Sequence, residues 1–189
     1  GFTVNLPVTE YKTGPTQTMD INVPPPGNGT TNLTLEFGAG QLNLAPGAEN
    51  ALVQGTVTYN VAEFKPVITT NGQDVKISTG NFQIKGLPSL QTKDFKNNWD
   101  LKLGSQPMAL KVNAGAHQGK LDLGGLSLTN LEVNDGAAEV DVNFSQPNLV
   151  DMNQFTYATG ASSVNLNQLA NANFAALVFR SGAGTYTLD

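Results

Sequence analysis

Apolar and polar residues alternate along most of this chain, and five of the alternating stretches share one pattern. Each has an apolar residue, any residue, a second apolar residue, two further residues and then Gly-Ala. The five copies are residues 33–39, 110–116, 131–137, 155–161 and 177–183. Alternation with a period of two is typical of short β-strands and not of helices.

A second pair of alternating apolar residues follows each Gly-Ala. The pairs are Leu42/Leu44, Leu121/Leu123, Val140/Val142, Val164/Leu166 and Tyr186/Leu188. In this alignment the copy at 110–116 has two extra residues before its pair, which places Asp122 beside Asp141. A degenerate sixth copy is expected around Gly72, with Val67 before it and Val75 after it.

The copies recur regularly along the second half of the chain. The last four glycines, at positions 115, 136, 160 and 182, are 21, 24 and 22 residues apart, and a regular period in this range indicates stacked structural units. A third apolar cluster, such as Leu126/Leu128, completes each unit. We therefore expect an all-β fold, a parallel β-solenoid built as a three-sided, β-helix-like stack of about 22-residue repeats.

An antiparallel β-sandwich is the alternative fold. Alternating strands and glycine-rich turns would also fit a sandwich. It would need two-residue hairpin signals between its strands, and Asn71-Gly72 is one candidate.

The Gly-Ala glycines are predicted to be structural corners, where the chain turns from one side of a coil to the next. Glycine permits a positive φ at such a corner, and the alanine beside it is small enough to let neighbouring coils approach. The predicted corners are Gly38, Gly115, Gly136, Gly160 and Gly182. Within the copies at 110–116 and 131–137, Lys111 and Glu132 occupy the same outward position in consecutive coils, so they are predicted to form an ion pair.

The domain organisation is expected to be simple. Residues 1–30 are rich in Thr and Pro, end in three consecutive prolines at 24–26, and are interpreted as an extended leader. Residues 31–189 are expected to form a single domain. Within it, residues 81–109 hold the only tryptophan, Trp99, and are expected to close over the junction between the two groups of repeats.

Composition excludes several classes of function. The chain has 189 residues and a net charge of −5, and only 10 residues are Lys or Arg. We expect no nucleic acid partner, because nucleic acid binding requires a basic face. Cysteine is absent, which excludes disulfides and thiolate metal sites. No apolar run is long enough to span a bilayer, so membrane contact is expected only through an anchor or signal outside this sequence.

Candidate catalytic residues are few. His117 is the only histidine, and no triad or metal site can be assembled around it from the sequence, so we interpret it as a polar loop residue. Asp122 and Asp141 would lie about 5 Å apart in a parallel stack. They could act as an acid/base pair or hold a cation, or belong to the outer polar ladder that alternation alone produces. No catalytic, metal-binding or cofactor-binding residue is assigned, and no cofactor is expected.

Several stretches, in this order, resemble the bacterial toast-rack family. They are LEFGAGQLNLAPGAENALVQGTVTYN at 35–60, KPVITTNGQDVKIS at 65–78, NNWDLKL at 97–103, GAAEVDVNF at 136–144 and NANF at 171–174. Such domains are similar to the C-terminal regions of cell-wall-active antibiotic response (LiaF-like) proteins and of phage-shock envelope proteins. The resemblance implies a stacked all-β fold of bacterial origin, attached to the cytoplasmic membrane, that senses or buffers envelope stress through protein contacts. It supplies no catalytic residue.

The expected function is that of a non-enzymatic, extracytoplasmic interaction domain with a protein partner or self-association. The precursor is expected to be attached to a membrane. A carbohydrate-binding or carbohydrate-active β-helix is one alternative, argued from the fold alone, and an adhesin or scaffold module is another. A glycan ligand therefore stays open.

The C-terminal end of the stack is the predicted contact surface. An uncapped solenoid end exposes core side chains and strand edges. The expected interface residues are Leu177, Phe179, Tyr186 and Leu188. Alternatively, the leader or the Trp99 segment folds across this end within the monomer.

Overall fold

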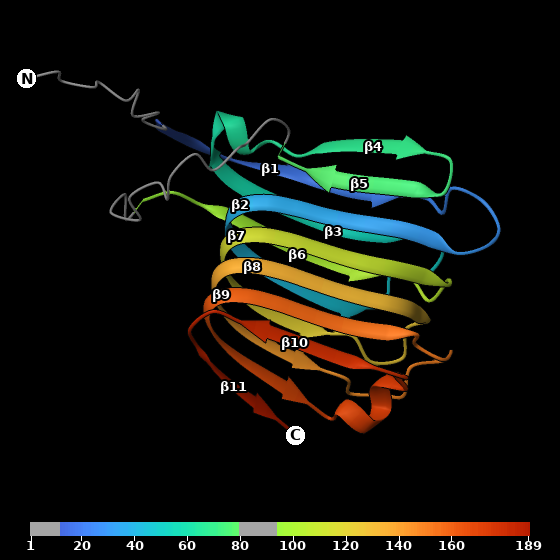
Figure 1. Cartoon of the computed structure of the whole chain (residues 1–189). Helices are drawn as coiled ribbons and strands as arrows, with labels where there is room; N and C mark the ends of the chain where they lie inside the picture. The colour runs from blue at the N-terminus through green and yellow to red at the C-terminus, as the bar shows by residue number, and fades with distance from the viewer. Residues whose placement is uncertain (1–11, 80–93) are drawn as a thin grey trace, which may run out of the picture.

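The computed structural model describes residues 12–79 and 94–189, and most of them lie in β-strands (Figure 1). The strands are β1 (Thr13–Val23), β2 (Thr31–Pro46), β3 (Val53–Val61), β4 (Val67–Asn71), β5 (Asp74–Ser78), β6 (Asn97–Leu103), β7 (Met108–Asp122), β8 (Leu128–Asn143), β9 (Gln154–Asn167), β10 (Leu177–Ser181) and β11 (Thr185–Leu188). The 3-10 turns η1 (Ala62–Phe64) and η2 (Leu169–Ala172) are the only helical segments of the described part. The predicted all-β class is confirmed.

The four long strands β2, β7, β8 and β9 lie side by side and run parallel (Figure 1). Their first halves pair in the register that the repeat predicts, with Leu33 beside Leu110, then Leu131, then Phe155. The shorter strands β10 and β11 continue the stack, because β10 pairs with the first half of β9 and β11 with its second half. The first half of each of the five sequence copies thus aligns as expected.

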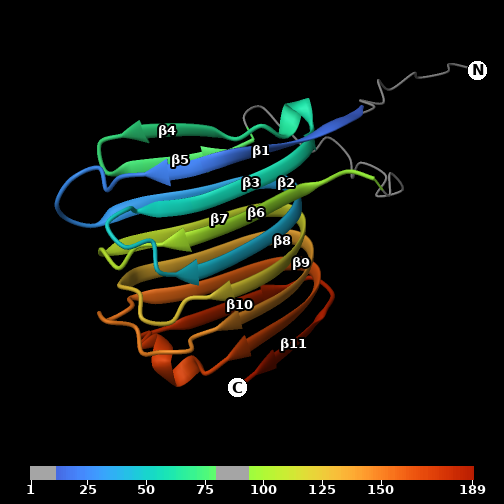
Figure 2. The same cartoon turned by 180° about the vertical axis from the view of Figure 1, so that it is seen from behind.

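Each long strand curves round one side of the molecule and continues on the opposite side (Figures 1 and 2). Between β2 and β7 the paired residues pass from Phe37–Ala114 directly to Ala39–Ala116, so the ladder skips the Gly-Ala glycine. The same gap recurs between β7 and β8 and between β8 and β9. The two halves of each strand therefore form two sheets that face each other across the core.

None of the Gly-Ala glycines has a positive φ, and at Gly136 and Gly160 the close approach of the neighbouring backbone requires glycine. Positive φ occurs at Gly29, Gly47, Gly55, Gly72 and Gly125 among the described glycines, and none of these is a predicted corner. A Cβ on Gly160 would lie 2.5 Å from the carbonyl oxygen of Gly136, and a Cβ on Gly136 would lie 2.8 Å from that of Gly115. The expected positive φ is wrong, and the contact between adjacent backbones accounts for the glycine.

The third side of each coil is a loop and not a strand, so the expected three-sided stack of strands is wrong in this respect. In residues 144–153 and 168–176 the only ladder contact is an isolated bridge between Met152 and Phe174. Side-chain amides satisfy much of the backbone there. Asn148 bonds both the N–H and the carbonyl of Leu128 at 2.9 Å, and Asn173 donates to the carbonyl of Asn148 at 2.8 Å. Such side-chain bonds offer the backbone an alternative to a β-ladder.

The other end of the stack is closed by antiparallel strands (Figure 2). β6 runs parallel to the second half of β2, β3 pairs antiparallel with β6, and β1 pairs antiparallel with β3. On the opposite sheet β5 runs parallel to the first half of β2, and β4 pairs antiparallel with β5. Consequently the segment between β2 and β7 caps the stack while β2 and β7 remain neighbours.

Three expectations about the first half change. The predicted leader, residues 1–30, contains β1, which is an edge strand of the sheet; residues 1–11 lie outside the described residues. The predicted sixth copy around Gly72 is a hairpin between β4 and β5, with Asn71 paired to Asp74 and Gly72 at φ 58°. Trp99 lies in β6, is fully buried and packs against Phe37 at 5.1 Å between ring centroids; residues 80–93 of that segment are outside the described part.

The predicted ion pair between Lys111 and Glu132 is confirmed. The two residues are partners in the β7–β8 ladder, and Nζ of Lys111 lies 3.1 Å from Oε2 of Glu132. Both side chains are nearly half exposed, so water screens their attraction. We expect Lys111→Ala to change the free energy of unfolding by less than about 1 kcal/mol. Urea denaturation of the variant measures this change. A larger loss would mean that the pair stabilises the fold more than an exposed ion pair normally does.

Candidate functional site

The second halves of the strands align without the two-residue insertion that we expected after Gly115. Gly119 lies beside Val140, and Leu121 lies beside Val142. Gly119 therefore occupies a position that is apolar in the neighbouring strands. The register places Asp141 beside Lys120, so the predicted pair of Asp122 and Asp141 is wrong.

The two aspartates have separate roles in the structure. Oδ1 of Asp122 accepts hydrogen bonds from the backbone N–H of Gly124 at 3.1 Å and from Oγ of Ser145 at 2.6 Å, so it fixes the turn after β7. Oδ1 of Asp141 accepts from Nδ2 of Asn165 on the next strand at 2.8 Å. Across the described ranges, 12–79 and 94–189, no group of three or more His, Asp or Glu side chains could hold a metal ion.

The outer face of the second sheet carries a shallow polar hollow of about 420 Å³. Its lining residues are Gln41, Asn43, Gln118, Gly119, Lys120, Glu139 and Asp141. The lining contains amides, one ammonium group and two carboxylates, but no aromatic ring. It could bind a polar ligand through hydrogen bonds, without the stacking platform that an aromatic side chain provides.

His117 is buried in β7, with 5% of its surface exposed, so its interpretation as a loop residue is wrong. Its ladder partners are Gly40 and Ala138, which are small and leave room for the imidazole. Gly119 also makes room, because a Cβ there would lie 3.3 Å from Cε1 of His117.

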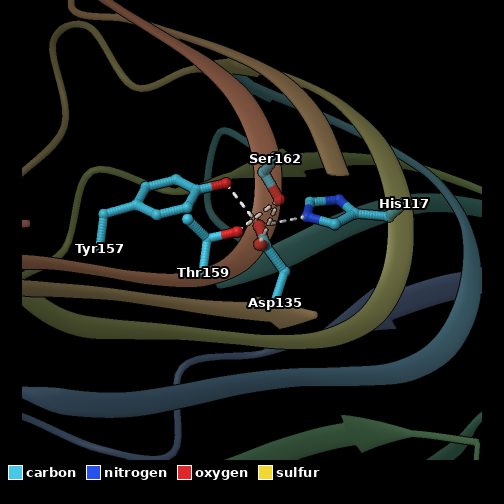
Figure 3. Close-up of polar contacts among 5 residues, drawn as sticks. All are labelled: His117, Asp135, Tyr157, Thr159 and Ser162. Atoms are coloured by element: carbon cyan, nitrogen blue, oxygen red, sulfur yellow. Dashed lines mark hydrogen bonds and ion pairs between the residues drawn. The ribbon is translucent and has the colours of Figure 1, made fainter. Parts of the chain in front are cut away.

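His117 belongs to a buried polar cluster centred on Asp135 (Figure 3). Oδ2 of Asp135 lies 3.1 Å from Nε2 of His117 and accepts from the hydroxyl of Tyr157 at 2.5 Å. Oδ1 accepts from Oγ of Ser162 at 3.1 Å, and Oγ1 of Thr159 in turn donates to Oγ of Ser162. The side chains of Asp135 and His117 are completely enclosed. Because β7, β8 and β9 each contribute, the cluster connects three consecutive coils.

The cluster holds Asp135 in its ionised form. Burial alone raises the pKa of this carboxyl, but the hydrogen bonds from His117 and Tyr157, with the charge interaction with His117, outweigh it and hold the pKa below the ordinary 3.8. Burial, followed by the negative charge of Asp135, raises the pKa of Tyr157 far above its usual range. Tyr157 therefore stays a neutral hydrogen-bond donor.

The arrangement does not match a serine–histidine–aspartate triad. In a triad the histidine lies between the acid and the nucleophile. Here Ser162 bonds directly to Asp135 and receives a bond from Thr159, and Nδ1 of His117 has no hydrogen-bond partner. The cluster is enclosed by the corner of the stack, so its geometry supports a structural role.

The four predicted interface residues lie together in the last two strands. Leu177 and Phe179 pack against the core, while Tyr186 and Leu188 are 53% and 48% exposed. The Phe179 ring stacks on Tyr157 at 5.5 Å and contacts Tyr186 at 4.4 Å between centroids. Within the described part, the outer edges of β10 and β11 pair with no strand.

The alternative, in which the leader or the Trp99 segment folds across this end, does not hold for the described residues. β1 pairs with β3, and Trp99 packs against Phe37, both at the opposite end of the stack. Among the described residues, the C-terminal end thus presents two open strand edges and the exposed side chains of Tyr186 and Leu188. Its role as an interface remains a prediction.

The fold and the sites above define an all-β domain of stacked parallel strands with a buried polar cluster and an open end. The chain belongs to the toast-rack family: the family model for the N-terminal domain of toast_rack, DUF2154, matches residues 12–166. The suspected toast-rack resemblance is confirmed.

Among solved structures, the fold is similar to a protein from Clostridium sporogenes described as a "putative cell adhesion protein". The TM-score is 0.75 at 21% sequence identity, over 92% of this chain and 99% of that one, so the similarity concerns the fold alone. No curated protein matches the chain. Within the described ranges, no helix has the length and apolarity required to cross a membrane.

Proposed function

We propose that this domain is a non-enzymatic interaction module of the bacterial cell envelope that binds through the open C-terminal end of a short β-solenoid. The observation that carries the proposal is the exposure of Tyr186 and Leu188 beside the unpaired edges of β10 and β11. Exposed apolar side chains next to open strand edges are typical of contact surfaces.

The interior of the stack favours binding over catalysis. The titratable residues brought together inside it, His117 and Asp135, are enclosed and engaged with one another. Neither can reach a dissolved substrate without opening the stack. The structural similarity to a "putative cell adhesion protein" also favours a role in contacts between macromolecules.

The location is proposed from the resemblance to the toast-rack family. An extracytoplasmic position, with membrane attachment through a segment outside this sequence, would place the open end where envelope proteins are available. A part in envelope-stress sensing or buffering would then follow from binding or release at this end.

Carbohydrate binding is the second candidate, supported by the polar hollow on the outer face. Lys120 and Glu139 line it, and such side chains can bond sugar hydroxyls. The aromatic rings of Phe155 and Tyr157, both in the first half of β9, are fully buried in the core, so they provide no stacking platform. We expect binding in a glycan array to be absent, and a glycan whose binding is lost in Glu139→Gln would instead favour this candidate.

A capture experiment tests the main proposal. Purified domain is immobilised and exposed to a bacterial membrane extract, alongside Leu188→Asp and the outer-face control Lys120→Ala. We expect the wild type and Lys120→Ala to retain the same envelope protein, or soluble copies of the domain itself, and Leu188→Asp to lose it. Retention that does not depend on Leu188 would contradict the proposal that the open end is the binding surface.

A further inference from the structure

We propose that the open end pairs with a second copy of this chain, around a two-fold axis that passes through the corner at Gly182 and Ala183. In this dimer β10 of one copy lies antiparallel to β11 of the other. The inference rests on the proposed function, in which this end is the contact surface, and adds the identity and geometry of its occupant.

The sequence around this corner has nearly the same pattern in both directions. Counting outward from the bond between residues 182 and 183, Ser181 corresponds to Gly184, Phe179 to Tyr186 and Leu177 to Leu188. Small, aromatic and aliphatic residues thus occur in the same order on both arms. A two-fold interface is self-complementary, so each patch must match its own image, and this pattern meets that requirement.

The strand directions fit the same operation. β10 runs towards the corner, and β11 runs away from it, and both are held by the bent strand β9. A two-fold axis along the bisector of the corner exchanges the two arms. Each β10 then meets the partner copy's β11 running in the opposite direction, which is the arrangement of an antiparallel ladder.

The side chains that face the core would stay on the core side across the interface. Phe179 lies beside the buried Tyr157, and Leu188 lies beside the buried Leu166. With five residues in β10 and four in β11, the exchange places Phe179 opposite Tyr186 of the second copy and Leu177 opposite its Leu188. A shift of one residue would turn these side chains to the outer face, so the register is strongly specified.

The outer faces of the two edges are compatible. The same register sets Val178 opposite Thr187 of the second copy and Arg180 opposite its Thr185. No like charges face each other, which would destabilise a strand pair. Neither β10 nor β11 contains a lysine or a proline, which are residues that commonly protect an edge strand from pairing.

Of the two edge strands at the opposite end, β1 and β4, β1 has such protection. Pro15 lies in β1, and the β1–β3 register shifts between Thr13 and Gln17. A proline and an irregular register both hinder the addition of another strand. Strand addition is therefore less favoured at β1 than at β10 and β11. Because the proposed two-fold pairing uses the same patch on both copies, its product is a closed dimer and not a filament.

Sedimentation equilibrium and cysteine cross-linking test the dimer. We expect the wild type to form dimers and Leu188→Asp to weaken the association at least about tenfold, because its carboxylate would be buried in the interface. Val67→Asp is the matched control, since Val67 is 47% exposed and Leu188 48%; it lies in β4, and its dimer should be unaffected. Thermal melts of both variants confirm that they are folded.

The cross-link distinguishes this pairing from others, since the chain has no natural cysteine. A mixture of Val178→Cys and Thr187→Cys chains should form a mixed disulfide, whereas β10 paired with itself would instead link Val178→Cys to Arg180→Cys. A monomeric wild type, a dimer insensitive to Leu188→Asp, or preference for the second link would each overturn the proposal. A monomer that still captures an envelope protein through Leu188 would overturn self-pairing alone and leave the proposed function in place.

Discussion

Replacing Gly160 by alanine is expected to lower the free energy of unfolding by about 1–3 kcal/mol, the range for overpacked sites. The added Cβ would lie 2.5 Å from the carbonyl oxygen of Gly136 in the preceding coil. That oxygen belongs to the backbone, so the two coils would have to separate to accept the methyl group. Urea denaturation, followed by circular dichroism, measures the loss.

Gly14→Ala is the matched control for this substitution. A Cβ on Gly14 would meet its nearest neighbour, the carbonyl oxygen of Asn60, at an ordinary 3.9 Å. Alanine there should leave stability unchanged or raise it slightly, because it restricts the unfolded chain. If both variants lost the same small amount, the close approach of adjacent coils would not be the reason for glycine at position 160.

Asp135→Ala is expected to lower the free energy of unfolding by about 3–5 kcal/mol, the cost of breaking a buried charged network by removing one partner. Asp135 accepts from His117, Tyr157 and Ser162. Without the carboxylate, these donors would remain buried and unpaired. Asp141→Ala is the control, because Asp141 is exposed on the outer face, and its loss should be within about 0.5 kcal/mol. Similar losses in both variants would contradict the account of the cluster.

Stability should also depend on acid through Asp135. The pKa of this carboxyl is lower in the folded protein than its ordinary value of 3.8. Its contribution is therefore fully present above pH 3.8 and is lost as the pH falls through the folded pKa. We expect Asp135→Asn to flatten this part of the curve of unfolding free energy against pH. A wild type and a variant that lose stability in parallel below pH 3.8 would show that another carboxyl is responsible.

The first halves of the repeats could be predicted from the sequence because apolar residues mark the first two inward positions of every copy. Leu110 and Leu131 identify the register directly, and the ion pair of Lys111 and Glu132 follows from it. The predicted register of the second halves was wrong because of one residue. Gly119 replaces an apolar side chain beside Val140, so matching apolar pairs alone introduced a false insertion.

That one false insertion placed Asp122 beside Asp141. The interpretation of His117 as a loop residue had a different origin, because the sequence shows no partner for it. The signal that could have located the buried cluster was Asp135 itself, which occupies the inward position held by Ala114 in the previous strand. A charged residue at an inward position requires partners, but their identity depends on contacts across the corner that no local pattern records.

The antiparallel cap could not be derived from periodicity either. β3 and β6 pair across an intervening segment of more than thirty residues, and Trp99 is buried because it lies between β2 and β3 and packs on Phe37. The loops on the third side of each coil could not be predicted from the sequence either. Their apolar residues resemble those of strands, while Asn148 and Asn173 bond the backbone in place of a ladder.

Amide hydrogen exchange at two protein concentrations tests most directly whether the open end is a contact surface for a second copy. The amides of β10 and β11 that do not bond β9 should exchange rapidly in dilute protein and become protected in concentrated protein. The amides of β2 and β7, inside the stack, should be protected equally in both. Exchange of β10 and β11 that is independent of concentration would contradict the account.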